Sequence, residues 1–115
     1  MSRTKRPVSV VDIQKAVGQR IRWAREEVCP NRAEFARLMG VDRTTLQKIE
    51  DGNRAPSVFN VLEIADRLRL STDYILRGTL RGLDGEIAGR LVAKHPELLA
   101  QDQDPVLLLT GPRPN

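Results

Sequence analysis

Apolar residues recur every three or four positions along most of this chain, which is the spacing of amphipathic helices. One such stripe predicts a helix of about five turns over residues 10–28: Ile13, Val17, Ile21, Ala24 and Val28. Runs of β-branched residues that alternate with polar ones, which would indicate strands, are absent from the sequence. The pattern therefore predicts an all-α protein.

Capping residues divide the N-terminal part of the chain into five predicted helices. Five residues can accept a hydrogen bond from a free amide of a first helical turn: Ser9, Asn31, Asp42, Ser57 and Ser71. Three glycines follow stretches of helical spacing: Gly40, Gly52 and Gly78. Glycine often ends a helix because it adopts positive φ readily. We therefore predict a five-helix unit that ends at residue 78, with its second and third helices at about 32–39 and 43–51.

The segment after Asn31 reads RAEFARLMGVDRTTLQKIEDG and combines two short helices with a tight turn at Gly40. Its apolar residues are spaced so that both helices face one core: Phe35, Met39, Val41, Leu46 and Ile49. Its second helix leaves a polar row on the outer face: Arg43, Thr44, Gln47 and Lys48. A braced helix that shows such a row to solvent is suited to the major groove of DNA.

The chain changes character after Gly82. Leu83, Ile87 and Leu91 form a narrow apolar stripe on a predicted helix at about 84–94, and a further turn can start at Pro96. This stripe can either fold back on the five-helix unit or meet a second subunit. We favour the second alternative, in which residues 79–100 are a helical extension with a dimer contact.

Charge is distributed unevenly over the 115 residues. Residues 1–82 carry 16 Lys/Arg and 10 Asp/Glu, whereas residues 83–115 carry 3 and 5. The basic front suits a polyanion such as double-stranded DNA. Residues 1–8 are expected to be a flexible basic arm, and residues 101–115 a flexible tail.

The residue inventory disfavours several other classes of protein. The single cysteine, Cys29, excludes an internal disulfide and suits a reducing cytoplasm. We expect neither a signal peptide nor a membrane span. The sequence offers no nucleophile with a nearby histidine, no phosphate-binding glycine loop and no paired carboxylates, so we do not expect an enzyme. We also expect no metal, no cofactor and no small-molecule ligand.

Over residues 17–78, more than half of its length, the chain resembles the Cro/C1-type helix-turn-helix family, also called the xenobiotic-response-element type. The resemblance is carried by VGQRIRWAREE, by RAEFARLMGVDRTTLQKIEDG, by Pro56 after the loop and by LEIADRLRLSTDYILRG. It implies a lambda-repressor-like DNA-binding domain over residues 9–78, with residues 43–51 as the recognition helix. It also implies a cytoplasmic, nucleoid-associated regulator or repressor of bacterial or phage type.

The resemblance also assigns roles to individual positions. The base-reading positions of the family fall on Arg43, Thr44, Gln47 and Lys48. Contacts with the DNA backbone fall on Arg32, Asn53 and Arg54, with Thr45 at the groove edge. Arg25 and Glu50 stand where the family has an ion pair. Relatives often carry Gln or Ser at the place of Arg43, and Gln at the place of Arg32, so both arginines are departures. Arg3, Lys5 and Arg6 are candidates for a minor-groove arm, as in other DNA binders.

Two functions from different classes remain open at this point. The first is a sequence-specific DNA-binding transcriptional regulator that acts as a homodimer on an inverted repeat, since one recognition helix reads only a few base pairs. The second is an antitoxin or co-regulator that uses the same fold as a protein-interaction module.

Overall fold

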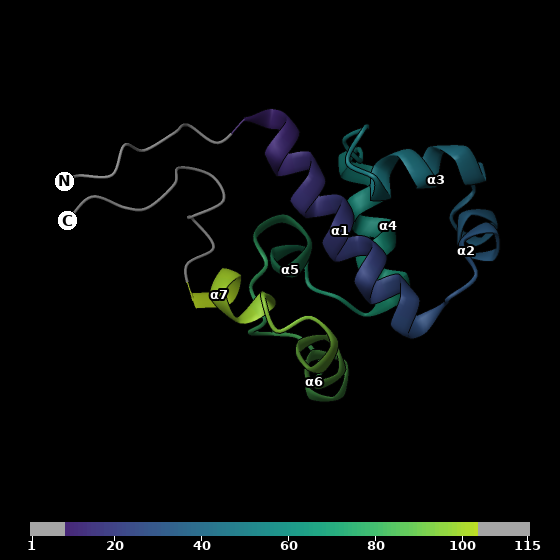
Figure 1. Ribbon diagram of the computed structural model, residues 1–115. Coiled ribbons are helices and arrows are strands. Elements are labelled where there is room, and N and C mark those ends of the chain that lie inside the picture. The colour runs from purple at the N-terminus through teal and green to yellow at the C-terminus, as the bar shows by residue number, and fades with distance from the viewer. Residues whose placement is uncertain (1–8, 104–115) are drawn as a thin grey trace.

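The computed structural model describes residues 9–103, and the elements in this range are helices and not strands (Figure 1). The all-α prediction is confirmed. The described helices are α1 (Val10–Val28), α2 (Arg32–Met39), α3 (Arg43–Glu50), α4 (Val58–Leu68), α5 (Thr72–Arg77), α6 (Gly85–Lys94) and α7 (Leu98–Gln103). The predicted arm, residues 1–8, and most of the predicted tail lie outside the described residues. Within residues 9–103, no helix has both the length and the apolar character needed to cross a bilayer.

The helices begin where the sequence predicted them because each predicted cap accepts a hydrogen bond from the first turn. The cap side chains accept from the backbone amides of the residues three positions on: Ser9 from Asp12, Asn31 from Glu34, Asp42 from Thr45, Ser57 from Asn60 and Ser71 from Tyr74. α2 and α5 end at Gly40 and Gly78, which adopt φ of 73° and 80°. These capping bonds satisfy amides that a helix leaves unpaired at its start.

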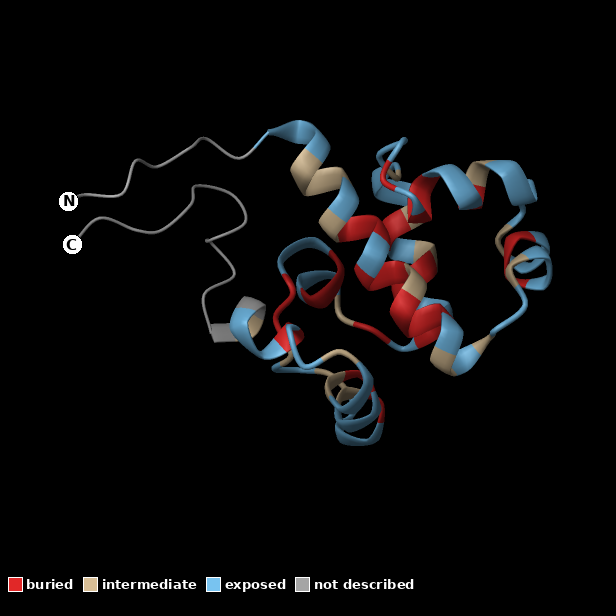
Figure 2. Ribbon diagram, in the orientation of Figure 1, coloured by how far each residue is buried: buried red, intermediate tan, exposed pale blue. Residues whose placement is uncertain are grey.

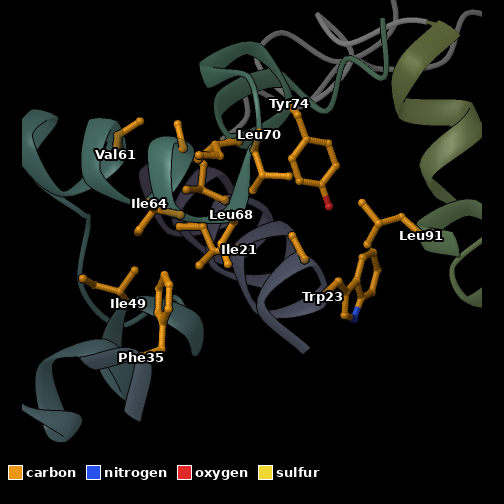
Figure 3. Packing of buried hydrophobic residues seen from close by; sticks show 14 of the residues in the cluster. Ile21, Trp23, Phe35, Ile49, Val61, Ile64, Leu68, Leu70, Tyr74 and Leu91 are labelled. Carbon is orange, nitrogen blue, oxygen red and sulfur yellow. The ribbon is translucent and has the colours of Figure 1, made fainter. Parts of the chain in front are cut away.

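α1 is the central element of the fold and contacts α3, α4, α5 and α6 (Figure 1). Its buried side faces a core to which the other helices contribute mostly aliphatic side chains (Figures 2 and 3). Ile21 and Ala24 of α1 are fully buried there. The fully buried partners from the other helices include Leu46, Ile49, Ile64, Tyr74 and Ile75.

The extension after residue 78 folds back on α1, so the preferred prediction for its stripe is wrong. Ile87 and Leu91 are buried in the core of the same chain, and Leu83 packs against that core. Figure 3 shows Leu91 next to Trp23 of α1. These side chains therefore cannot serve as the dimer contact in this fold. A stripe of period 3.6 indicates which side of a helix is buried, but it does not indicate which surface covers that side.

Two further contacts join the extension to α1. The rings of Trp23 and His95 stack with centroids 3.8 Å apart and an angle of 8° between their planes. The Lys94 ammonium forms an ion pair with Glu27 at 2.6 Å. Leu98 of α7 is fully buried, so both helices of the extension add to the core.

Arg20 is a charged residue of α1 that is buried among mostly apolar side chains. Its side chain is almost fully buried, and Nε and Nη1 have no hydrogen-bond partner among the described residues. Burial lowers the pKa of Arg20 to about 10, because an apolar surrounding disfavours the charged form. The Tyr74 hydroxyl donates to the Arg20 carbonyl oxygen at 3.1 Å, and burial raises the pKa of that phenol.

Candidate nucleic-acid interface

α3 has one buried side and one exposed side, and the structure brings the four predicted base-reading residues together on the exposed side. Leu46 and Ile49 are fully buried and anchor the helix to the core. Four polar residues are exposed on its surface: Arg43, Thr44, Gln47 and Lys48. Thr45 is half-buried at the edge of this row. Because residues three and four apart lie on the same side of a helix, the row forms one continuous polar face.

The turn between α2 and α3 fixes the direction in which α3 leaves the core. Gly40 adopts a left-handed conformation, and the Val41 amide donates to the Ala36 carbonyl at 3.0 Å. Ala36 is buried on α2. Asp42 then starts α3 by accepting a hydrogen bond from the Thr45 amide at 2.7 Å. Hydrogen bonds from Thr45, assisted by the charges of Arg54 and Lys48, lower the pKa of Asp42.

A buried charge network holds the end of α3 against α1 and α2. The Arg25 Nε donates to Glu50 Oε2 at 2.5 Å, and its Nη2 donates to Oε1 at 3.2 Å. Arg32 Nε donates to the same Oε1 at 3.0 Å. The carboxylate of Glu50 is fully buried and the Arg25 side chain nearly so. The ion pair expected between Arg25 and Glu50 is therefore present, and Arg32 is a third member.

Arg32 thus has a partner that the sequence did not reveal. It was expected to contact the DNA backbone, but its Nε is engaged by Glu50 and its side chain is only 29% exposed. Nothing in the spacing of residues 32 and 50 indicates this contact, because it depends on the crossing of α2 and α3. In this fold Arg32 positions α3, whether or not its remaining donors also reach a phosphate.

Two glycines allow the end of α3 to approach α1, and sequence reasoning missed both of these contacts. A Cβ atom on Gly18 would lie 2.2 Å from the carbonyl oxygen of Ile49. A Cβ atom on Gly52 would lie 2.6 Å from the Cα of Lys15. The Gln14 side-chain amide also donates to the Gly52 carbonyl at 3.2 Å. A lone glycine in the middle of a helical stripe was the available signal at Gly18.

The remaining predicted contacts lie around this surface. Asn53 and Arg54 are exposed in the loop between α3 and α4. The arm residues Arg3, Lys5 and Arg6 lie outside the described residues. Within residues 9–103, no cluster of three or more His, Cys, Asp or Glu side chains is arranged to hold a metal ion. The arrangement is a polar helix face bordered by a loop that carries Asn53 and Arg54.

Comparisons with known proteins agree with this geometry. A family model described as helix-turn-helix matches residues 21–75. The crystal structure of the restriction-modification controller protein C.AhdI from Aeromonas hydrophila is 30% identical, with a TM-score of 0.52, over 57% of this chain and 94% of that one. The DNA-binding domain of the P22 C2 repressor, solved in solution, is 27% identical, with a TM-score of 0.53, over 65% of this chain and 96% of that domain. No curated protein sequence matches.

Proposed function

Because this chain belongs to the Cro/C1-type helix-turn-helix family of DNA-binding transcriptional regulators, we propose that it binds an inverted repeat as a homodimer. One α3 of each copy would lie in the major groove. The observation that carries the proposal is the division of α3 into a buried apolar side and an exposed polar side.

The exposed row supplies the donors and acceptors that base edges require. Arg43 can bind guanine O6 and N7 with two hydrogen bonds, and Gln47 can bind adenine N6 and N7 in the same way. Lys48 contributes a point charge, and Thr44 offers a hydroxyl and a methyl group. Arg43 stands at the first turn of α3, where helices of this class approach the bases most closely.

Backbone contacts are assigned to residues on the rim of the same surface: Arg32, Thr45, Asn53 and Arg54. These contacts would fix the register of the protein on DNA without reading its sequence. Arg54 and Lys48 also add positive charge next to the capped start of α3, as their effect on the pKa of Asp42 indicates. The affinity should therefore fall steeply with salt concentration.

A surface formed by α4 and α5 supports the homodimer. Its exposed large apolar side chains are Val58, Phe59, Leu62 and Leu76. A groove of about 310 Å³ runs between them and is lined by Pro56, Val58, Val61, Leu62, Thr72 and Leu76. Contiguous apolar surface of this kind marks an interaction site on a protein of this size. The α4–α5 surface replaces the buried stripe of α6 as the proposed dimer contact.

The position of the α4–α5 surface fits a dimer that binds two half-sites. It begins at Pro56, directly after the loop that holds Asn53 and Arg54. A twofold contact uses the same patch on both copies. Two copies joined here would bring their backbone-contacting loops towards the symmetry axis and direct both recognition helices at one side of the duplex. Half-sites about 34 Å apart, one turn of DNA, would then be expected.

Selection of duplexes from a random pool tests the DNA-binding proposal. We expect an inverted repeat to be enriched, and Arg43→Ala to lose preference at one base pair by about 1–3 kcal/mol while retaining non-specific binding. Binding without any preferred duplex, or an Arg43→Ala protein that selects the same sequence as the parent, would refute the assignment.

Sedimentation equilibrium tests the dimer contact separately. We expect Leu62→Glu to shift the protein to monomer, because the substitution would bury like charges across the twofold axis. Leu99→Glu on α7 is the matched control, since Leu99 is 47% exposed and Leu62 is 51% exposed. A dimer that survives Leu62→Glu but not Leu99→Glu would move the contact to the extension.

A further inference from the structure

We propose that a cleft between α1 and the end of α3 binds a phosphate group of the DNA backbone and extends the contact beyond the predicted residues. This inference rests on the proposed function. The cleft has a volume of about 720 Å³ and is open to solvent. Its polar lining comes from α1, from the last residue of α3 and from the loop that follows: Lys15, Gln19, Arg22, Glu50, Asp51 and Asn53.

The three α1 residues lie on one side of that helix. They are spaced by four and three positions, so their side chains project in nearly the same direction. Lys15 and Gln19 are exposed, and Arg22 is half-buried. Lys15 is in none of the ion pairs within residues 9–103, so its charge is available to an anion.

Arg22 has a donor that lacks a partner. Its Nε is buried and makes no hydrogen bond among the described residues. The nearest carboxylate is Glu26, 3.7 Å away, which is beyond hydrogen-bond distance. The Arg22 side chain is nevertheless 42% exposed and lines the cleft, so its guanidinium charge faces an anion bound there. Gln19 and Asn53 add neutral donors of the kind that commonly contact phosphate oxygens.

The cleft is held next to the DNA-facing loop by fixed contacts. The Gln14 side chain donates to the Gly52 carbonyl at 3.2 Å, and the Lys15 backbone lies against Gly52. Figure 1 shows the loop after α3 beside the N-terminal half of α1. Asn53 belongs both to this cleft and to the predicted backbone contacts. A strand that contacts Asn53 would therefore pass the mouth of the cleft.

The acidic residues at the cleft allow a sharper test. The Glu50 carboxylate is buried and forms ion pairs with Arg25 and Arg32, so their positive charges balance its negative charge. Asp51 is exposed, and its negative charge opposes a phosphate in the cleft. Lys15 and Asp51 should therefore affect DNA affinity in opposite directions, although neither side chain contributes to the core.

The experiment measures DNA affinity of the full chain between 0.05 and 0.3 M salt (about the range in which counterion release dominates). The probes are the selected duplex and a random duplex. We expect Lys15→Gln to weaken binding to both duplexes on the order of fivefold at 0.1 M salt. It should also reduce the slope of log K against log salt by about 0.9. Asp51→Asn should strengthen binding to both duplexes by a similar factor. Arg81→Gln on the extension is the control, since Arg81 is exposed and lies outside the cleft.

Each alternative result has a distinct meaning. The cleft proposal would be overturned if Lys15→Gln kept the wild-type slope of log K against log salt and Asp51→Asn left the DNA affinity unchanged. This holds even if inorganic phosphate shifted the NMR signals of Arg22. If Lys15→Gln weakened binding to the selected duplex but not to the random duplex, the cleft proposal would also be overturned, because a phosphate contact carries no sequence information. Failure of the unmodified chain to bind either duplex would instead refute the proposed function.

Discussion

The two sides of α1 hold their partners by different physical means. On one side, α3 is fixed by the buried charges of Arg25, Arg32 and Glu50 and by backbone contact at Gly18. On the other side, the extension is held mainly by apolar burial of residues such as Leu91, with a ring stack and one ion pair at the edge. The first set of contacts is directional, whereas the second is mostly non-directional.

This difference matches what each side has to do. Hydrogen-bonded charges require particular distances and angles, so they define where α3 lies relative to the core. Apolar packing adds free energy of folding roughly in proportion to buried area and tolerates small shifts. We therefore expect that damage on the α3 side changes both stability and DNA binding, and that damage on the extension side changes stability alone.

Glu50→Ala should give the largest effect. Removal of the carboxylate leaves Arg25 buried without its counter-charge, which should reduce the free energy of unfolding by roughly 3–5 kcal/mol. Thermal denaturation followed by circular dichroism measures this, and stability should fall more than DNA affinity measured well below the melting temperature. The control is Glu86→Ala, since Glu86 is 80% exposed and lies 3.7 Å from Arg90, and such pairs contribute little. An unchanged melting temperature for Glu50→Ala would mean that the pair does not hold α3.

Leu91→Ala tests the opposite side of α1. Truncation of this fully buried side chain should cost about 2–5 kcal/mol of stability, because a cavity replaces the lost contacts. DNA affinity at low temperature should stay within twofold of wild type, since the recognition face is not involved. Leu99→Ala, at an exposed position of α7, should leave both quantities nearly unchanged. A large loss of affinity in Leu91→Ala would show that the extension also positions α3.

Two glycine substitutions compare the same change in two environments. Gly18→Ala should destabilise by roughly 1–3 kcal/mol, because its Cβ would overlap the Ile49 carbonyl oxygen and force α3 away from α1. Gly89→Ala in α6 should stabilise by about 0.5–1 kcal/mol, since nothing lies within 4 Å of the added Cβ and alanine favours helix. Denaturation by urea measures both, and equal effects of the two substitutions would contradict the close approach at Gly18.

The sequence predicted what depends on local chemistry and missed what depends on how helices cross. Caps such as Asp42 and the outward row of α3 follow from neighbouring residues, so both were predictable. The contact between Arg32 and Glu50 depends on the crossing of α2 and α3, and the approach at Gly18 depends on the crossing of α1 and α3. The apolar stripe around Leu91 gave the buried side of α6 correctly but not the surface that buries it, because an amphipathic helix packs equally well on its own chain or on another.

Arg20→Met should give a small effect in the stabilising direction. Arg20 is buried near Tyr74 of α5, with two nitrogen atoms that have no hydrogen-bond partner among the described residues, and its lowered pKa reflects the cost of burying the charge. A methionine of similar length keeps the packing without the charge, so the free energy of unfolding should rise by about 1 kcal/mol. Arg81→Met, at an exposed site, should change it by less than about 0.5 kcal/mol. Denaturation by urea at neutral pH distinguishes the two. A clear loss of stability in Arg20→Met would show that the buried guanidinium has a favourable partner, and directional contacts of α1 would then extend beyond the α3 side.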